Sequence, residues 1–180
     1  KPLRRLDTPE KVNGAAKFGL DVSLPGMLTA VIARPPVFGA KVRSVKDGKA
    51  KTVPGVKIVA QVPSGVAVIA KDFWSAQKGR AALEISWDEG PLSSLSTAGM
   101  RVQYADLAKT PGLAAKKEGD VDAAMAKAVK QLSAEYEVPY LAHATMEPMN
   151  CTVELKRNSC EIWTGTQFQT LDRNAAAEVA

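Results

Sequence analysis

The stretch Val56-Lys-Ile-Val-Ala-Gln-Val62, followed closely by Val66-Ala-Val-Ile-Ala70, decides the fold of this chain. Both runs are rich in β-branched residues, which favour strands because their side chains pack well on a pleated surface. Pro54-Gly55 lies before the first run, and proline and glycine are residues that interrupt regular structure. The sequence therefore predicts two apolar strands here.

Strand and helix signals alternate on both sides of these two strands. Asp72 is a residue type that caps helix N-termini, so a helix is predicted from Asp72 to Leu83, with Phe73, Ala76 and Ala82 on its inner side. The other predicted elements are strands at 26–33, 41–45 and 84–87 and a short helical turn at 47–52. This order indicates a compact α/β (α+β) domain, assigned to residues 1–89.

The remaining residues change character. Residues 90–119 contain Gly90-Pro91 and Pro111-Gly112, which are typical of connectors, so this stretch is predicted to be a linker with one helix at 97–108. Residues 120–180 are predicted to begin a second, truncated domain. Its expected elements are a short helix at 120–126, a strand at 128–138, an irregular stretch at 139–150, a hairpin of 151–155 with 160–164, and a terminal helix after Thr166-Gln167.

Composition and charge exclude several classes of function. The hydrophobic fraction of 46% and the charged fraction of 24% are ordinary for a globular protein. The formal charge is +5, but acidic residues lie between most of the basic groups, and no basic run alternates with aromatic residues. We therefore expect no nucleic-acid binding. No apolar run reaches the roughly 20 residues of a membrane span. The chain starts at Lys1 rather than Met, so missing targeting signals carry no meaning.

The two cysteines, Cys151 and Cys160, lie on either side of a predicted turn at Arg157-Asn158. In the simplest register Lys156 faces Ser159, which pairs Cys160 with Leu155 and leaves Cys151 far along the strand. A disulfide requires Cα atoms closer than about 7 Å. Both cysteines are therefore predicted to be reduced.

The segment Tyr136-Glu-Val-Pro-Tyr-Leu-Ala-His143-Ala-Thr-Met-Glu147-Pro148 contains the only histidine. A zinc site built on histidines is excluded for that reason, and no nucleophile elbow, P-loop or Rossmann glycine motif occurs. His143 and Glu147 are four residues apart, but the prolines at 139 and 148 make a long helix unfavourable. The residues alone favour a structural pair that fixes a loop, with an acid–base pair and a metal half-site as alternatives.

A second candidate is Trp163-Thr-Gly-Thr166-Gln167 at the end of the predicted hairpin. A glutamine that leaves a strand beside a glycine is able to present its amide to a ligand. The simpler interpretation is a strand-to-helix turn in which Thr166 is the N-cap and Gln167 lies in the first helical turn.

Two segments resemble the molybdenum-binding subunit of the xanthine dehydrogenase/aldehyde oxidase family. The first begins Arg4-Arg-Leu-Asp-Thr-Pro-Glu-Lys-Val-Asn-Gly and continues through Leu24-Pro-Gly-Met-Leu28. It is similar to the opening of that family's α/β hammerhead domain. The second combines Ala142-His-Ala-Thr-Met-Glu-Pro148 with Trp163–Gln167. It is similar to the start of the first molybdopterin-binding domain. These motifs most resemble those of the isoquinoline 1-oxidoreductase β-subunit branch.

The resemblance implies an enzyme that oxidises an aldehyde or an aromatic N-heterocycle with oxygen from water. It implies a molybdopterin cofactor in its cytosine dinucleotide form, an iron–sulfur small subunit carrying [2Fe-2S], and a cytochrome c-type electron acceptor. Gln167 is expected to lie at the cofactor, with Thr166 shaping the turn. His143 and Glu147 are expected to brace the loop behind it. A periplasmic location is expected, with a cytoplasmic one as the alternative.

The resemblance also implies what residues 1–180 lack. The glycine-rich Phe-Gly segment near molybdenum and the general-base glutamate of the family do not occur in this stretch. We therefore expect no catalytic residue and no protein ligand to the metal here. The isolated chain is expected to bind no cofactor tightly and to be inactive. The alternative function is a non-catalytic scaffold that docks a partner subunit.

Overall fold

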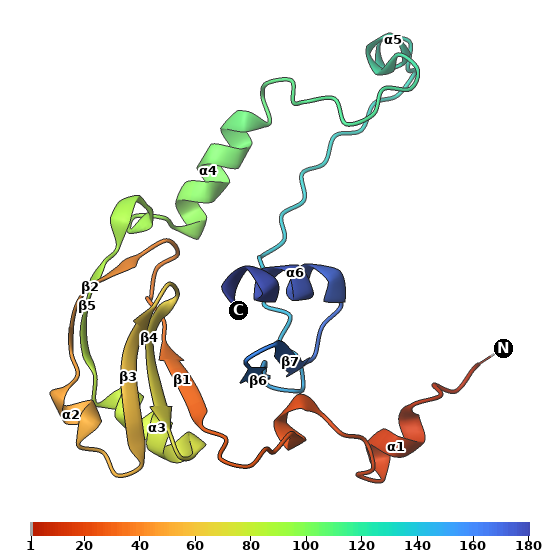
Figure 1. Ribbon diagram of the computed structural model, residues 1–180. Helices are drawn as coiled ribbons and strands as arrows, with labels where there is room; N and C mark the ends of the chain where they lie inside the picture. The colour runs from red at the N-terminus through yellow and green to blue at the C-terminus, as the bar shows by residue number, and fades with distance from the viewer. Residues whose placement is uncertain (1) are drawn as a thin grey trace. The chain divides into compact units, whose positions relative to one another are not determined.

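The computed structural model describes residues 2–180, which form two compact units (Figure 1). The first, here called the sheet unit, is Gly26–Glu135. The second, the hairpin unit, combines residues 2–25 with Tyr136–Ala180. The sequence-based division assigned residues 1–89 to one domain, whereas the structure groups residues 2–25 with the C-terminal part of the chain.

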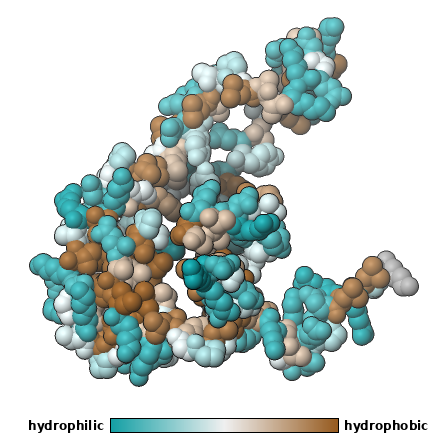
Figure 2. All heavy atoms as spheres, viewed as in Figure 1, coloured by the Kyte–Doolittle hydropathy of each residue, from teal (hydrophilic) through white to brown (hydrophobic). Residues whose placement is uncertain are grey.

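An antiparallel sheet in the order β1-β4-β3 forms the centre of the sheet unit. Its strands are β1 (Thr29–Ala33), β4 (Gly65–Ala70) and β3 (Val56–Val62), so the two apolar runs are confirmed as strands. They are neighbours, and Val68 pairs with Val31 on one side and Val59 on the other. Because β4 is central, nearly all of it is buried. Figure 2 shows hydrophobic atoms gathered over these strands.

Two helices complete the core of the sheet unit. They are α2 (Gly48–Lys51) and α3 (Phe73–Ala81), and α3 packs on β1 and β4. The predicted cap is confirmed, since Asp72 Oδ1 accepts a hydrogen bond of 2.7 Å from the Ser75 amide. The prediction for Phe73 was wrong, because its side chain is 51% exposed. The fully buried residues are small or β-branched: Ala50, Val66, Val68, Ala70 and Ala76.

Val68 is fully buried in the central strand, so its truncation tests the core directly. We expect Val68→Ala to lower the free energy of unfolding of the sheet unit by roughly 2–3 kcal/mol, from lost apolar burial and the cavity left behind. Val102→Ala is the matched control, since Val102 is 64% exposed. Urea unfolding followed by circular dichroism gives both values. Equal effects of the two substitutions would contradict the placement of Val68 in the core.

A two-stranded ribbon, β2 (Lys41–Lys46) with β5 (Glu84–Asp88), forms the rest of the strand structure in this unit. Basic side chains on β2 and α2 face acidic partners on β5. Lys49 Nζ lies 2.6 Å from Glu84 Oε1, and Arg43 Nη2 lies 3.7 Å from Asp88 Oδ1. These pairs are exposed and stabilise the fold only weakly. They show that part of the net positive charge is neutralised locally.

The sheet unit continues through η2 (Gly90–Leu92), α4 (Thr97–Leu107) and α5 (Val121–Ala126), which confirms the helices expected at 97–108 and 120–126. The strand expected at 128–138 was wrong. These residues have no regular structure and all are exposed. Residues 128–138 do alternate between polar and apolar side chains, but a strand also needs a neighbouring strand that pairs with its backbone hydrogen-bonding groups.

The hairpin unit contains α1 (Thr8–Val12), η1 (Gly19–Asp21), β6 (Cys151–Lys156), β7 (Ser159–Thr164) and α6 (Gln169–Val179). The predicted register is confirmed, since Lys156 pairs with Ser159 and Leu155 with Cys160. Both cysteines are free. Residues 139–150 are irregular, as expected. Within residues 2–180 no helix has the length and apolar character to cross a membrane.

Candidate functional site

The turn between β7 and α6 is held by the side chain of Thr166. Its hydroxyl oxygen accepts a hydrogen bond of 3.1 Å from the Phe168 amide and donates a short hydrogen bond to Asp172 Oδ2. Helix α6 begins at Gln169, and its N-cap residue, Phe168, makes no side-chain cap. The interpretation of Thr166 as the N-cap was therefore wrong by two residues. Thr166 instead connects the loop between β7 and α6 to the start of α6, through its hydrogen bonds with Phe168 and Asp172.

This turn borders a groove of about 1140 Å³ between the hairpin and α6. The strands contribute Cys151, Cys160, Ile162 and Thr164, which share one face of the hairpin because they alternate along β6 and β7. The turn contributes Gly165 and Thr166. Helix α6 contributes the polar residues Gln169, Asp172 and Arg173 and several alanines. The groove is thus apolar on the strand side and polar at the start of the helix.

The structure places the two expected cofactor residues differently. Thr166 lines the groove and is half-buried, whereas Gln167 is exposed and is not among the lining residues. Its role at a cofactor stays a prediction. Sequence reasoning missed Gln169, Asp172 and Arg173. Their spacing of three and four residues places them on one face of a helix, so the helical period of residues 169–180 was the signal that could have identified them.

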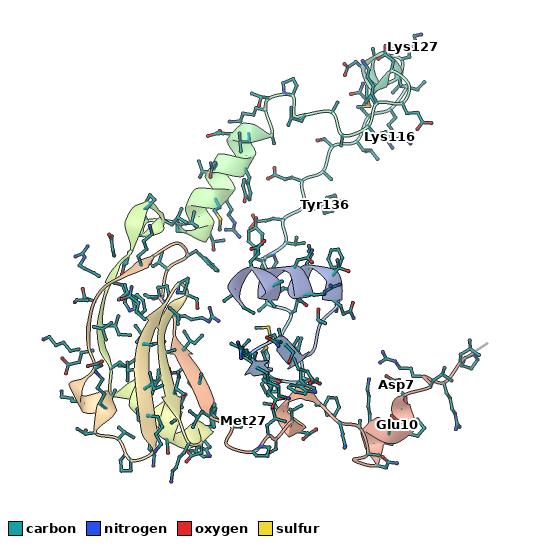
Figure 3. All side chains as sticks on the ribbon, in the orientation of Figure 1. Asp7, Glu10, Met27, Lys116, Lys127 and Tyr136 are labelled. Carbon is teal, nitrogen blue, oxygen red and sulfur yellow. The ribbon has the colours of Figure 1, made fainter. Side chains whose placement is uncertain are left out.

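Glu147 and His143 have different surroundings. Glu147 is half-buried, and its Oε1 accepts hydrogen bonds of 2.9 Å from both the Gly19 amide and Asn150 Nδ2. His143 is exposed in the irregular segment, and beside it Ala144 has a positive φ of 43°. The structure therefore does not bring the two together as an acid–base pair. Figure 3 shows side chains of the hairpin crowded against η1.

The pKa of the Cys151 thiol is raised by its surroundings. Its partial burial raises its pKa above the ordinary 9.0, and the nearby Cys160 and Asp172 raise the pKa further. Burial, more than the nearby charges, therefore disfavours the thiolate form of Cys151. Residues 2–180 contain no group of three or more His, Cys, Asp or Glu side chains close enough to hold a metal ion.

The raised pKa of Cys151 predicts slow alkylation. At pH 8.5 we expect Cys151 to react with iodoacetamide several-fold more slowly in the folded chain than in urea, because less of it is thiolate. Asp172→Asn should speed the folded reaction, since it removes one negative charge. Peptide mass spectrometry measures the rates. The folded chain holds the thiol proton more tightly than the unfolded chain, because its Cys151 pKa is raised. This difference contributes to the free energy of unfolding below pH 9, and the contribution is lost as the pH rises through the raised pKa. Equal rates in folded and unfolded chains would contradict the partial burial of this thiol in the groove.

Comparison with known proteins shows which family the chain is similar to. The family model of the molybdopterin cofactor-binding domain matches residues 106–180, which include the whole groove. The chain is 34% identical to the beta subunit of isoquinoline 1-oxidoreductase from Brevundimonas diminuta, over 99% of the chain and 24% of the relative. It is 32% identical to a membrane-bound aldehyde dehydrogenase [pyrroloquinoline-quinone] of Gluconacetobacter polyoxogenes, over 94% of the chain and 23% of the relative.

Quinoline 2-oxidoreductase from Pseudomonas putida 86 has a similar fold. Its crystal structure matches 98% of the chain and 28% of its own chain, with a TM-score of 0.69 and 15% identity. The chain thus spans about a quarter of the length of the two curated relatives described above.

The fold and the matched domain define a molybdopterin-binding class of protein. Within that class, the chain matches part of the large, molybdenum-binding subunits of the xanthine dehydrogenase/aldehyde oxidase type. The resemblance in the two sequence segments is confirmed, as is the mixed α/β fold that begins a molybdopterin-binding domain.

The polar end of the groove fits an organic cofactor better than a bare metal ion. Gln169 and Arg173 offer amide and guanidinium groups on one side, and the Thr166 hydroxyl, bonded to Asp172 and Phe168, keeps one acceptor site. Such groups suit the hydrogen-bonding edge of a pterin and the charge of a phosphate. All three come from the turn and the first two turns of α6, so their spacing is fixed by short-range structure.

Proposed function

We propose that the protein containing this chain is a molybdenum hydroxylase that oxidises an aldehyde or an aromatic N-heterocycle, with the added oxygen taken from water. The observation that carries the proposal is the match of residues 106–180 to a molybdopterin-binding domain, because this range contains the groove beside Thr166. The names of the relatives support both substrate classes, since they include an isoquinoline oxidoreductase and an aldehyde dehydrogenase.

In this proposal the groove holds part of the cofactor. Thr166, Gln169 and Arg173 would hold its polar atoms, and Gln167 would reach it from the neighbouring position in the turn. When bound, the molybdenum–pterin group supplies the redox chemistry. The residues of this chain bind and orient it, and the general base lies outside residues 1–180.

The proposal includes partners and a location. Two relatives are named as subunits of larger enzymes, an isoquinoline 1-oxidoreductase from Brevundimonas diminuta and a nicotinate dehydrogenase from Pseudomonas putida. We accordingly propose an iron–sulfur small subunit with [2Fe-2S] and a cytochrome c-type acceptor for the electrons. The cytosine dinucleotide form of the cofactor and a periplasmic location are part of the same proposal.

Isotope labelling tests the proposed reaction. The full-length protein, purified with its partner subunits, is given benzaldehyde or isoquinoline and an artificial electron acceptor in H₂¹⁸O. We expect one ¹⁸O atom in the oxidised product of at least one of the two substrates. Benzaldehyde exchanges oxygen with water, so isoquinoline gives the cleaner result, and a parallel sample in ¹⁸O₂ with ordinary water is the control. Incorporation from ¹⁸O₂, or no turnover of either class, would contradict the proposal.

A scaffold function is the second candidate, and one observation favours it for part of the chain. The sheet unit has its own buried core around Val68, and the groove does not include any of its residues. Hydrogen exchange of the complex tests this: docking predicts slower exchange on exposed strands of the sheet unit when the partner subunit is present. Unchanged exchange throughout Gly26–Glu135 would contradict a docking role.

A further inference from the structure

Glu147 connects parts of the chain that are far apart in sequence. Its Oε1 accepts a hydrogen bond of 2.9 Å from the backbone amide of Gly19, 128 positions away. Gly19 is the first residue of η1, and the first amides of a helix have no hydrogen-bond partner within the helix. The Glu147 carboxylate supplies the acceptor for this amide. A charged acceptor makes such a bond about twice as strong as a neutral one.

Asn150 completes this contact from the other side. Its Nδ2 donates to Glu147 Oε1 at 2.9 Å and to the Pro148 carbonyl at 2.8 Å, which fixes the side chain against the loop. Its Oδ1 is buried without a hydrogen-bond partner. That oxygen lies where a Cβ atom on Gly19 would overlap it. Only a glycine therefore fits at position 19 without moving Asn150.

The same residue reaches the turn that borders the groove. The backbone carbonyl of Asn150 accepts a hydrogen bond of 3.0 Å from the hydroxyl of Thr164. Thr164 ends β7 and directly precedes Gly165 and Thr166, whose hydroxyl is bonded to Asp172 at the start of α6. A hydrogen-bonded path thus runs from Gly19 through Glu147, Asn150 and Thr164 to the turn.

We propose that Gly19, Glu147 and Asn150 form a clasp through which the N-terminal segment, residues 18–21, positions the turn Thr164–Phe168. The clasp residues are positioning residues, since none of them lines the groove. The importance of the turn for cofactor binding rests on the function proposed above. The clasp itself depends only on contacts within the hairpin unit.

The first test is hydrogen exchange by NMR on the 180-residue chain. Glu147→Leu removes the acceptor, and Gly19→Ala forces Asn150 aside. Both are expected to speed exchange of the residue-19 amide at least tenfold and to shift the amide resonances of Thr166 and Gln167. Glu147→Gln keeps a carbonyl oxygen and should restore much of the protection. The controls are Glu161→Gln, an exposed carboxylate on β7, and Gly112→Ala, where a Cβ meets open space.

The outcomes separate the clasp from the proposed function. Faster exchange at residue 19 with unchanged Thr166 and Gln167 resonances would overturn the clasp, because Glu147 would then hold only the N-terminal segment. Failure of Glu147→Gln to restore protection would overturn it as well. The same variants in the full-length protein are then assayed for bound molybdenum. Shifted resonances with unchanged molybdenum would keep the clasp and contradict the proposed role of the turn. If Gly19→Ala does not fold, the two Glu147 variants decide.

Discussion

Replacing Gly65 with alanine is expected to remove most of the stability of the sheet unit. Gly65 begins β4 directly after the turn from β3, and its φ of 141° is a conformation that residues with a side chain rarely adopt. A Cβ atom there would overlap the backbone carbonyl of Ala33 on β1. Backbone strain of about 1–3 kcal/mol and a clash with a fixed strand that costs a similar amount together destabilise the unit by roughly 2–6 kcal/mol.

Gly48→Ala is the matched control for this prediction. Gly48 begins α2, its φ is ordinary, and nothing lies within 4 Å of an added Cβ. Alanine favours helix by up to about 1 kcal/mol over glycine, so this variant should be as stable as the parent or slightly more so. Thermal unfolding of both variants gives the comparison. A Gly65→Ala chain that unfolds within a few degrees of the parent would show that β1 and β4 do not pair as described.

Thr166→Val is expected to have the largest effect on the proposed site. Valine matches threonine in shape but removes both the donor to Asp172 and the acceptor for the Phe168 amide. The turn then loses its connection to α6, and Asp172 loses its partner. Loss of a residue that orients a cofactor site typically costs about 10–100-fold in affinity or activity. In the full-length protein we expect a similar loss of substrate oxidation and weaker retention of the pterin during dialysis.

Thr170→Val separates this effect from a general effect of valine. Thr170 lies in the same helix, is exposed and does not line the groove. Its substitution should leave pterin fluorescence and turnover within about twofold of the parent. If Thr166→Val also stays within that range while folding normally, the turn does not position the cofactor.

The local elements of this chain could be predicted because each has a short-range signal. The β-branched runs of β3 and β4, the Asp72 cap of α3 and the two-residue turn of the β6–β7 hairpin depend on residues close in sequence. The hairpin register in particular follows from the position of Arg157-Asn158, since the turn sets which residues face each other.

What could not be predicted depends on distant partners. Residues 128–138 alternate between polar and apolar side chains as a strand does, but these residues do not determine whether a neighbouring strand is present. The grouping of residues 2–25 with the hairpin unit depends on contacts such as Glu147 with Gly19, across 128 positions. The residues alone indicated that Glu147 helps to fix a loop, and the family resemblance placed that loop behind the cofactor site. Its distant partner is the backbone amide of Gly19, which no side-chain motif identifies.

At the groove, sequence reasoning identified the turn but not the helix face beside it. Thr166 was found because it lies in a recognisable motif, and the structure places it at the groove. Gln169 and Arg173 lie just beyond that motif, and their position at the groove is recognised only when residues 169–179 are placed on a helix. Gln167 is exposed, and its role at a cofactor stays a prediction.

Cofactor analysis of the full-length protein tests the central claim most directly. One relative is named for pyrroloquinoline-quinone, whereas the family model that matches residues 106–180 is a molybdopterin-binding domain. Molybdenum is measured by inductively coupled plasma mass spectrometry, and the organic cofactor is extracted and identified by mass spectrometry. We predict about one molybdenum and one pterin per chain. A fully active preparation that contains pyrroloquinoline-quinone and no molybdenum would contradict the assignment to the molybdenum hydroxylases.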